Sequence, residues 1–233
     1  MDERKNKLLK SIIDEYVDSA EAVGSGLIVG KYELNVSPAT IRNEMMELEK
    51  DGYIYQPHTS AGRIPTEKGY KYYVDNFLKK RVISQNVKNN LITLLGQKDL
   101  SEEMKIKNIA KILASDSNEA VIVAFEAMNI YYTGISNLFS QPEFYEHRLV
   151  CNISEVIDSM DKVVFQCYNS IGGKENILIG RENPFSNVCS SVMAKFNFAN
   201  KNILMCILGP MRMDYGKNLG LIECVKELLE DSI

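Results

Sequence analysis

The stretch from Ser37 to Gly52 constrains the fold most, because it carries both a start and a stop signal for one short helix. Ser37 can accept a hydrogen bond from a first-turn amide, and Pro38 follows where its missing N–H costs nothing. Gly52 can adopt the left-handed conformation that ends helices. Helical spacing predicts a buried apolar side and an opposite polar side, made of Ile41, Met45 and Leu48 against Thr40, Arg42, Asn43 and Glu47.

The polar side of this helix favours one function. Arg and Asn side chains near the start of a helix can read base edges in the major groove of DNA. The alternative is an ordinary amphipathic surface helix, which shows the same pattern.

Further helices and a hairpin are predicted around this helix. A small polar loop over 57–62 separates two short strands, which makes a two-stranded wing. The order of elements predicts a winged helix-turn-helix domain over residues 1–81. The flanking elements are helices over 3–19 and 25–32, a turn over 33–36, strands over 53–56 and 63–66, and a helix from Thr66.

The remainder of the chain has a different pattern. We interpret the polar stretch 82–103 as a connector and 104–233 as a second domain, in which strands alternate with helices. This mixture predicts an α+β fold with an antiparallel sheet. The expected strands are 120–125, 129–133, 162–168, 176–180, 188–196 and 203–208, and the expected helices are one from Met104, one over 153–160 and one over 214–230.

Charge is distributed unevenly along the chain, whose net charge is −4. Residues 62–81 contain six cations and only two acids, which suits a strip that faces DNA phosphates; a solvated charged face is the alternative. The cations are Arg63, Lys68, Lys71, Lys79, Lys80 and Arg81, and the acids are Glu67 and Asp75.

Composition narrows the functional classes. No apolar run is long enough for a membrane span, the first residues lack a signal-peptide pattern, and free thiols fit the cytoplasm. Five widely spaced cysteines and two histidines form no zinc motif, so no metal is expected. They also form no catalytic Ser/His/Asp or Cys/His arrangement, so we expect neither enzymatic activity nor a cofactor.

Several motifs together resemble one known family, the heat-inducible transcription repressor HrcA. In the first domain they run almost unbroken from Leu8 to Asp75. They include Ser37-Pro-Ala-Thr-Ile-Arg-Asn-Glu-Met45, Gln56-Pro-His-Thr-Ser-Ala-Gly-Arg63 and Pro65-Thr-Glu-Lys-Gly-Tyr-Lys-Tyr-Tyr-Val-Asp75. Three later motifs follow in the family's order, namely Gly134-Ile-Ser-Asn-Leu-Phe-Ser-Gln-Pro-Glu-Phe144, Ile179-Gly-Arg-Glu-Asn-Pro184 and Gly209-Pro-Met-Arg-Met-Asp-Tyr215.

The resemblance implies a bacterial repressor with a GAF-like second domain. Such proteins bind double-stranded operator DNA with an inverted repeat, as homodimers, upstream of chaperone operons. A chaperonin modulates their activity, and heat stress releases them. This chain departs from the family because only residues 126–133 separate the strand at 120–125 from Gly134, where the family usually carries an inserted dimerising domain. Gly26 also replaces a usual Arg.

Ten residues are predicted to contact DNA. Arg42 and Asn43 are assigned to bases, although Arg42 has an internal ion pair or a phosphate contact as alternatives. Wing residues are assigned to the backbone or minor groove, with a plain hairpin turn as the alternative, and the two lysines to phosphates. The set is Ser37, Thr40, Arg42, Asn43, His58, Thr59, Ser60, Arg63, Lys68 and Lys71. A small-molecule sensor in the second domain is the competing hypothesis.

Overall fold

The structure is a computed structural model that describes residues 1–32, 36–126, 129–145, 158 and 160–230. The chain divides into two compact units, Met1–Leu78 and Lys79–Ile233. Within the described residues, no helix is both long and apolar enough to cross a bilayer.

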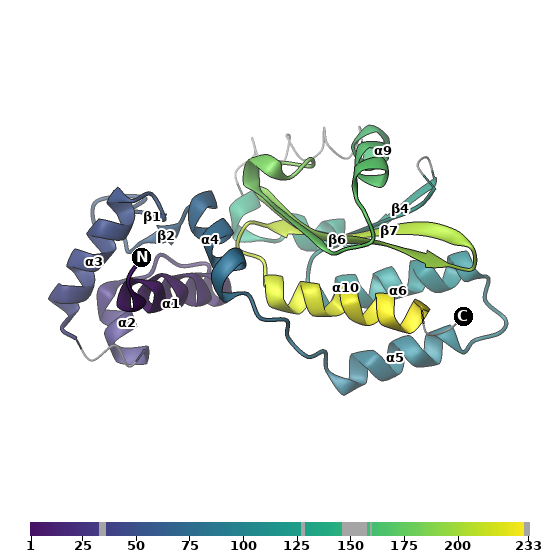
Figure 1. Ribbon diagram of the computed structural model, residues 1–233, viewed down its shortest axis with the longest axis horizontal. Coiled ribbons are helices and arrows are strands. Elements are labelled where there is room, and N and C mark those ends of the chain that lie inside the picture. Colours follow the sequence, from purple (N-terminus) through teal and green to yellow (C-terminus); the bar gives the residue numbers. More distant parts are fainter. Residues whose placement is uncertain (33–35, 127–128, 146–157, 159, 231–233) are drawn as a thin grey trace. The chain divides into compact units, whose positions relative to one another are not determined.

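The first unit contains four helices and a two-stranded hairpin (Figure 1). Strands β1 and β2 are antiparallel, with Ile54 opposite Pro65. Three helices, a hairpin and a fourth helix follow one another in the order that the sequence predicts. The elements are α1 (Glu3–Ser19), α2 (Ser25–Lys31), α3 (Pro38–Lys50), β1 (Ile54–Tyr55), β2 (Ile64–Pro65) and α4 (Glu67–Phe77). The predicted turn over 33–36 lies mostly outside the described residues.

Helix α3 begins and ends as its sequence predicts. The Ser37 hydroxyl accepts a hydrogen bond of 3.2 Å from the Thr40 amide, and Gly52 has a φ of 78°. The apolar side of α3 is buried in the core of the unit, where each large aliphatic side chain contributes about 1.5–3 kcal/mol. Its buried apolar residues are Ile41, Met45 and Leu48.

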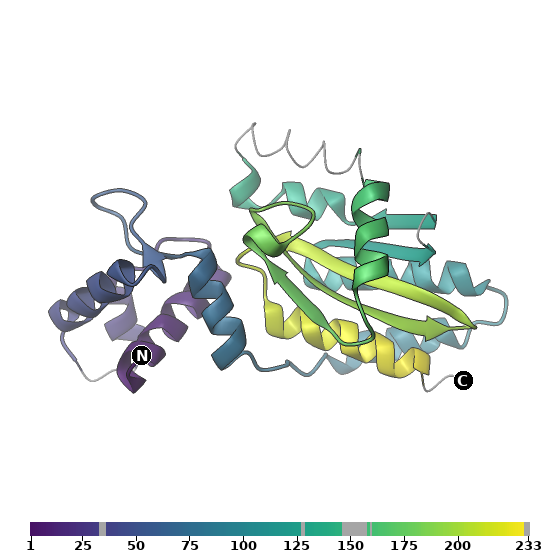
Figure 2. The same ribbon diagram turned by 45° about the horizontal axis from the view of Figure 1, so that its top comes forward.

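The second unit is an antiparallel sheet with helices on both faces. The strand order is β4-β3-β7-β6-β5. Helices α6 and α10 lie along one face, with α5 packed against them, and α9 lies on the other face (Figures 1 and 2). The strands are β3 (Ala120–Glu126), β4 (Asn129–Thr133), β5 (Asn176–Ile179), β6 (Cys189–Phe198) and β7 (Lys201–Pro210). The helices are α5 (Gln85–Leu95), α6 (Glu102–Ser117), α7 (Ile135–Phe139), α9 (Met160–Ser170) and α10 (Tyr215–Glu230), with 3₁₀ turns at Pro142–Phe144 and Gly180–Glu182.

Burial on both faces explains the continuous apolar run of β3. Successive side chains of a strand point to opposite faces. Ile122 belongs to the core cluster that includes Val164 of α9, whereas its neighbours Val121 and Val123 are also fully buried. The predicted α+β class with an antiparallel sheet is therefore confirmed.

One prediction for the second part differs from the structure, and another falls outside the residues that the structure describes. Residues 162–168 lie in helix α9 and form no strand. The buried positions Met160, Val164 and Cys167 have helical spacing, so burial on one helix face outweighs the β-propensity of the valines. The predicted helix over 153–160 lies almost entirely outside the described residues.

The predicted connector also contains packed structure. Helix α5 buries Val87, Leu91 and Leu94, and it contacts α6 and α10. The structure therefore assigns 82–103 to the second unit, which begins at Lys79 rather than at residue 104. The sequence did not indicate this packed helix, because the stretch is mostly polar and its apolar stripe has only three residues.

Candidate nucleic-acid interface

One exposed stripe of α3 contains the two residues that the sequence assigns to base contacts, Arg42 and Asn43. Positions 39, 42, 43 and 46 follow helical spacing and share a face. We call this the reading stripe, and it consists of Ala39, Arg42, Asn43 and Met46, all exposed.

The three acids of α3 are paired with cations of the same unit. Glu44 pairs with Arg4, and the Glu47 carboxylate lies 2.6 Å from the Lys5 ammonium, whose pKa this hydrogen bond raises. Glu49 lies 2.9 Å from the Arg63 guanidinium. A free carboxylate close to a phosphate would repel it. These ion pairs therefore leave the reading stripe without an acidic side chain of its own helix.

The wing is fastened to the rest of the unit by Gln56. Its side-chain amide donates hydrogen bonds to the carbonyls of Thr59 at 3.0 Å and Ala61 at 2.9 Å. Its backbone N–H donates to the Glu49 carboxylate at 2.8 Å. The loop between β1 and β2 therefore has a defined shape and a fixed attachment to α3.

Arg63 holds the base of the wing through both its backbone and its side chain. Its backbone exchanges hydrogen bonds of 2.9 Å with Val23, which forms an isolated β-bridge. Its side chain is 12% exposed and pairs with Glu49. Ala22 and Val23 also approach Gly62 so closely that an added Cβ would lie 2.4 Å from the Val23 carbonyl carbon.

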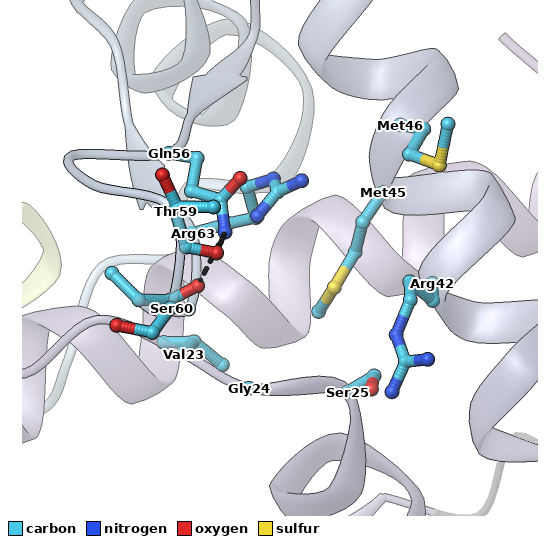
Figure 3. Close-up of a pocket in the computed structure, with 12 residues that line it drawn as sticks. Val23, Gly24, Ser25, Arg42, Met45, Met46, Gln56, Thr59, Ser60 and Arg63 are labelled. Atoms are coloured by element: carbon cyan, nitrogen blue, oxygen red, sulfur yellow. Dashed lines mark hydrogen bonds between the residues drawn. The ribbon is translucent and has the colours of Figure 1, made fainter.

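A cavity of about 440 Å³ lies between α3 and the wing. Figure 3 shows Arg42, Met45 and Met46 on the helix side, and Gln56, Thr59 and Ser60 on the wing side. The Arg42 side chain extends toward Ser25 at the start of α2. The helix and the wing thus border one concave surface.

The structure places the ten predicted residues in two groups. Six of them are exposed and lie on α3, at its start or on the wing: Ser37, Arg42, Asn43, His58, Thr59 and Ser60. Of these, Arg42, Thr59 and Ser60 line the concave surface. Thr40 is half-buried, with its hydroxyl 3.0 Å from that of Ser37. The Nδ1 atom of His58 lies 3.4 Å from the hydroxyl oxygen of Ser60.

The three remaining cations have internal partners. Arg63 pairs with Glu49, and Lys71 with Glu67 at 2.8 Å. The Lys68 ammonium donates to the Asp51 carbonyl at 2.7 Å and lies 4.4 Å from the centre of the Tyr53 ring.

The basic strip over 62–81 is not one surface. Lys80 and Arg81 belong to the second unit, where they pair with Glu223 and Asp214 of the α10 region. The hydrogen bond with Glu223 raises the pKa of Lys80. The excess of positive charge in the sequence is thus largely neutralised locally.

A polar cluster in the second unit involves the later motifs. Arg212 pairs with Glu143 and donates to the Gln141 side-chain carbonyl at 2.7 Å. Burial raises the pKa of Glu119 well above its usual value, with Arg212 opposing and Glu143 reinforcing the shift. An added Cβ on Gly209 would lie 2.2 Å from the Glu119 carboxylate, so a larger residue there would displace the Glu119 side chain. Among the described side chains, no group of three His, Cys, Asp or Glu could hold a metal ion.

Sequence reasoning missed Met46, Gln56 and Glu49. Met46 follows Arg42 by one helical turn, which was a usable signal. Gln56 and Glu49 act through contacts across the hairpin, for which the sequence carries no local signal.

Comparisons with known proteins agree with this architecture. Residues 69–219 match the family model of the HrcA protein C-terminal domain. The chain is 27% identical to the heat-inducible transcription repressor HrcA of Carboxydothermus hydrogenoformans over 338 aligned positions, with 100% of this chain and 98% of that protein covered. Since this chain has 233 residues, 105 of those positions have no counterpart here.

Shorter stretches are more similar. The HrcA repressor of Pelotomaculum thermopropionicum is 59% identical over 85 residues, which cover 36% of this chain and 24% of that protein. That of Desulfitobacterium hafniense is 50% identical over 112 residues, 48% of this chain and 30% of that protein.

A solved structure shares the fold. The crystal structure of a hypothetical protein superposes with a TM-score of 0.75 at 17% identity, covering 99% of this chain and 98% of that one. With a family model that spans well over half of its residues, the chain belongs to the HrcA family.

Proposed function

We propose that this chain is a sequence-specific DNA-binding repressor of heat-shock (chaperone) operons. The observation that carries the proposal is the reading stripe of α3, which is exposed, lacks a free acid of its own helix and borders a wing held by Gln56. The named relatives are heat-inducible transcription repressors, which supports a regulatory role rather than an enzymatic one.

The proposed contacts follow the two groups of residues. Arg42 and Asn43 contact bases, since an Arg–guanine or Asn–adenine pair gives about 1–3 kcal/mol of discrimination. Ser37, Thr40, His58, Thr59 and Ser60 contact the backbone or the minor groove. Arg63 and Lys68 contribute by holding the wing and α4 in position, because their partners lie on other elements. Lys71, whose partner Glu67 lies on the same helix, contacts a phosphate.

The assembly and regulation are proposed from the family. The chain binds an inverted-repeat operator as a homodimer, because a two-fold DNA site matches a two-fold protein. It acts in the cytoplasm, at the nucleoid when bound, a chaperonin modulates its activity, and heat stress releases it. Mass determination with and without operator DNA tests the dimer, and a monomer in both conditions contradicts it.

A binding titration tests the central proposal. The full chain is titrated into a labelled inverted repeat from upstream of the chaperone genes, with a scrambled duplex as control. We expect a preference of about 10³-fold or more for the operator and a steep fall of affinity with salt, because phosphate contacts release counterions. Equal affinity for both duplexes at moderate salt would contradict sequence-specific binding.

A further inference from the structure

Met46 is an exposed apolar side chain in the middle of a polar surface. It is 55% exposed, whereas its neighbour Met45 is 3% exposed and packs in the core. An exposed methionine on a helix contributes little to the core of its own unit. Its side chain is therefore available for contact with a partner.

Geometry places Met46 beside the base-reading residues. It lies one turn after Arg42, and both line the concave surface between α3 and the wing (Figure 3). The nearest acids in sequence, Glu44 and Glu47, pair with Arg4 and Lys5. A duplex whose base edges contact Arg42 would therefore also contact the Met46 thioether.

The chemistry of the two side chains differs. Arg42 offers hydrogen-bond donors, which suit guanine. Met46 offers a flexible, polarizable apolar group without a donor. In the major groove, the apolar group that distinguishes one base from the others is the 5-methyl group of thymine.

We propose that Met46 contacts the 5-methyl group of a thymine in each operator half-site and determines specificity at that position. This inference rests on the proposed function, because it requires that α3 enters the major groove. It adds to Arg42 and Asn43 a residue that selects by apolar contact.

Uracil substitution tests the proposal directly. Each thymine of the operator is replaced in turn by deoxyuridine, which keeps the base pair and removes only the methyl group. At one position per half-site, the wild-type chain should lose about fourfold in affinity, which corresponds to roughly 0.8 kcal/mol for one buried methyl-sized group. At that position Met46→Ala should bind the thymine and uracil duplexes equally.

Two further variants control the experiment. Met104→Ala removes a methionine of similar exposure, 44%, from α6 in the second unit and should keep the wild-type ratio. Met46→Leu should restore most of the thymine preference. Met46→Ala and the wild type should bind the uracil duplex with similar affinity, which shows that the variant is folded.

The outcomes separate this inference from the function on which it rests. If the wild type prefers the operator but no uracil substitution weakens binding, or if Met46→Ala keeps the wild-type ratio, the role of Met46 is refuted while repressor function stands. If the wild type shows no preference for the operator, both are refuted.

Discussion

Replacing Arg63 with alanine distinguishes two roles for this cation. One is a contact with a DNA phosphate, and the other is an internal ion pair with Glu49 that holds the wing to α3, which we call the clasp. The structure favours the clasp, because the Arg63 side chain is 12% exposed and its guanidinium lies 2.9 Å from Glu49. Glu49 also accepts a hydrogen bond from the backbone N–H of Gln56, so its carboxylate connects α3 to both ends of the loop between β1 and β2. Loss of Arg63 should therefore loosen the wing.

The magnitude follows from the burial of the pair. Removing one partner of a fully buried ion pair costs about 3–5 kcal/mol, whereas an exposed pair contributes about 0–1 kcal/mol. Glu49 is 33% exposed, so water partly solvates the carboxylate that remains. We expect the free energy of opening of the wing to fall by about 1–3 kcal/mol.

Hydrogen exchange of the full chain measures this loss, read at the amides of Ala61 and Arg63, which donate within the wing and to Val23. At the upper end of the range, their exchange should accelerate by about a hundredfold. Glu49→Gln provides a double-mutant cycle, because glutamine keeps an acceptor for the Gln56 N–H but not the charge.

Salt dependence of operator binding distinguishes the two roles. A cation that neutralises one phosphate contributes about 0.9 to the slope of log affinity against log salt. Arg63→Ala should weaken binding while leaving this slope unchanged. If the slope falls by about one and amide exchange stays at the wild-type rate, Arg63 is a phosphate contact and the clasp interpretation is wrong.

Three further predictions concern other parts of the chain. Arg42→Ala should reduce the ratio of operator to scrambled-duplex affinity by about 5- to 150-fold, which corresponds to about 1–3 kcal/mol, with little change in melting temperature; an unchanged ratio would exclude a base contact. Gly62→Ala should destabilise the first unit by about 1–3 kcal/mol or more, because its Cβ would overlap the Val23 backbone, and a wild-type urea midpoint would contradict this. Burial raises the pKa of Glu119, so the folded state is most stable at low pH, where this carboxyl is protonated in both the folded and the unfolded chain. This stability is lost as pH rises above about 4.5 toward the pKa of Glu119 in the folded state. Glu119→Gln should therefore raise the melting temperature at pH 8 and not near pH 4, and an equal effect at both would refute a buried neutral carboxyl.

Local chemistry made the first unit predictable from sequence. The cap at Ser37, the start at Pro38 and the stop at Gly52 act over a few residues, so their effects can be read in order. The apolar stripe of α3 likewise follows from periodicity alone. These features fixed which side chains of α3 remain exposed.

Nonlocal packing limited prediction elsewhere. Residues 162–168 read as a strand because Val163 and Val164 favour β-structure, yet one face of α9 packs on the sheet. Lys68 and Arg63 looked free because their partners, the Asp51 carbonyl and Glu49, are contributed by other elements. The sequence shows charges, but only the fold shows which are already neutralised.

The attachment of the wing through Gln56 and Arg63 has a consequence for operator choice. Because the Glu49 carboxylate of α3 binds both Gln56 and Arg63, α3 and the wing are held at a fixed separation. A duplex fits only if the span from its base edges to its neighbouring sugar–phosphate chain matches that separation. We therefore expect base steps that widen or narrow the grooves to change the affinity even where no side chain touches them.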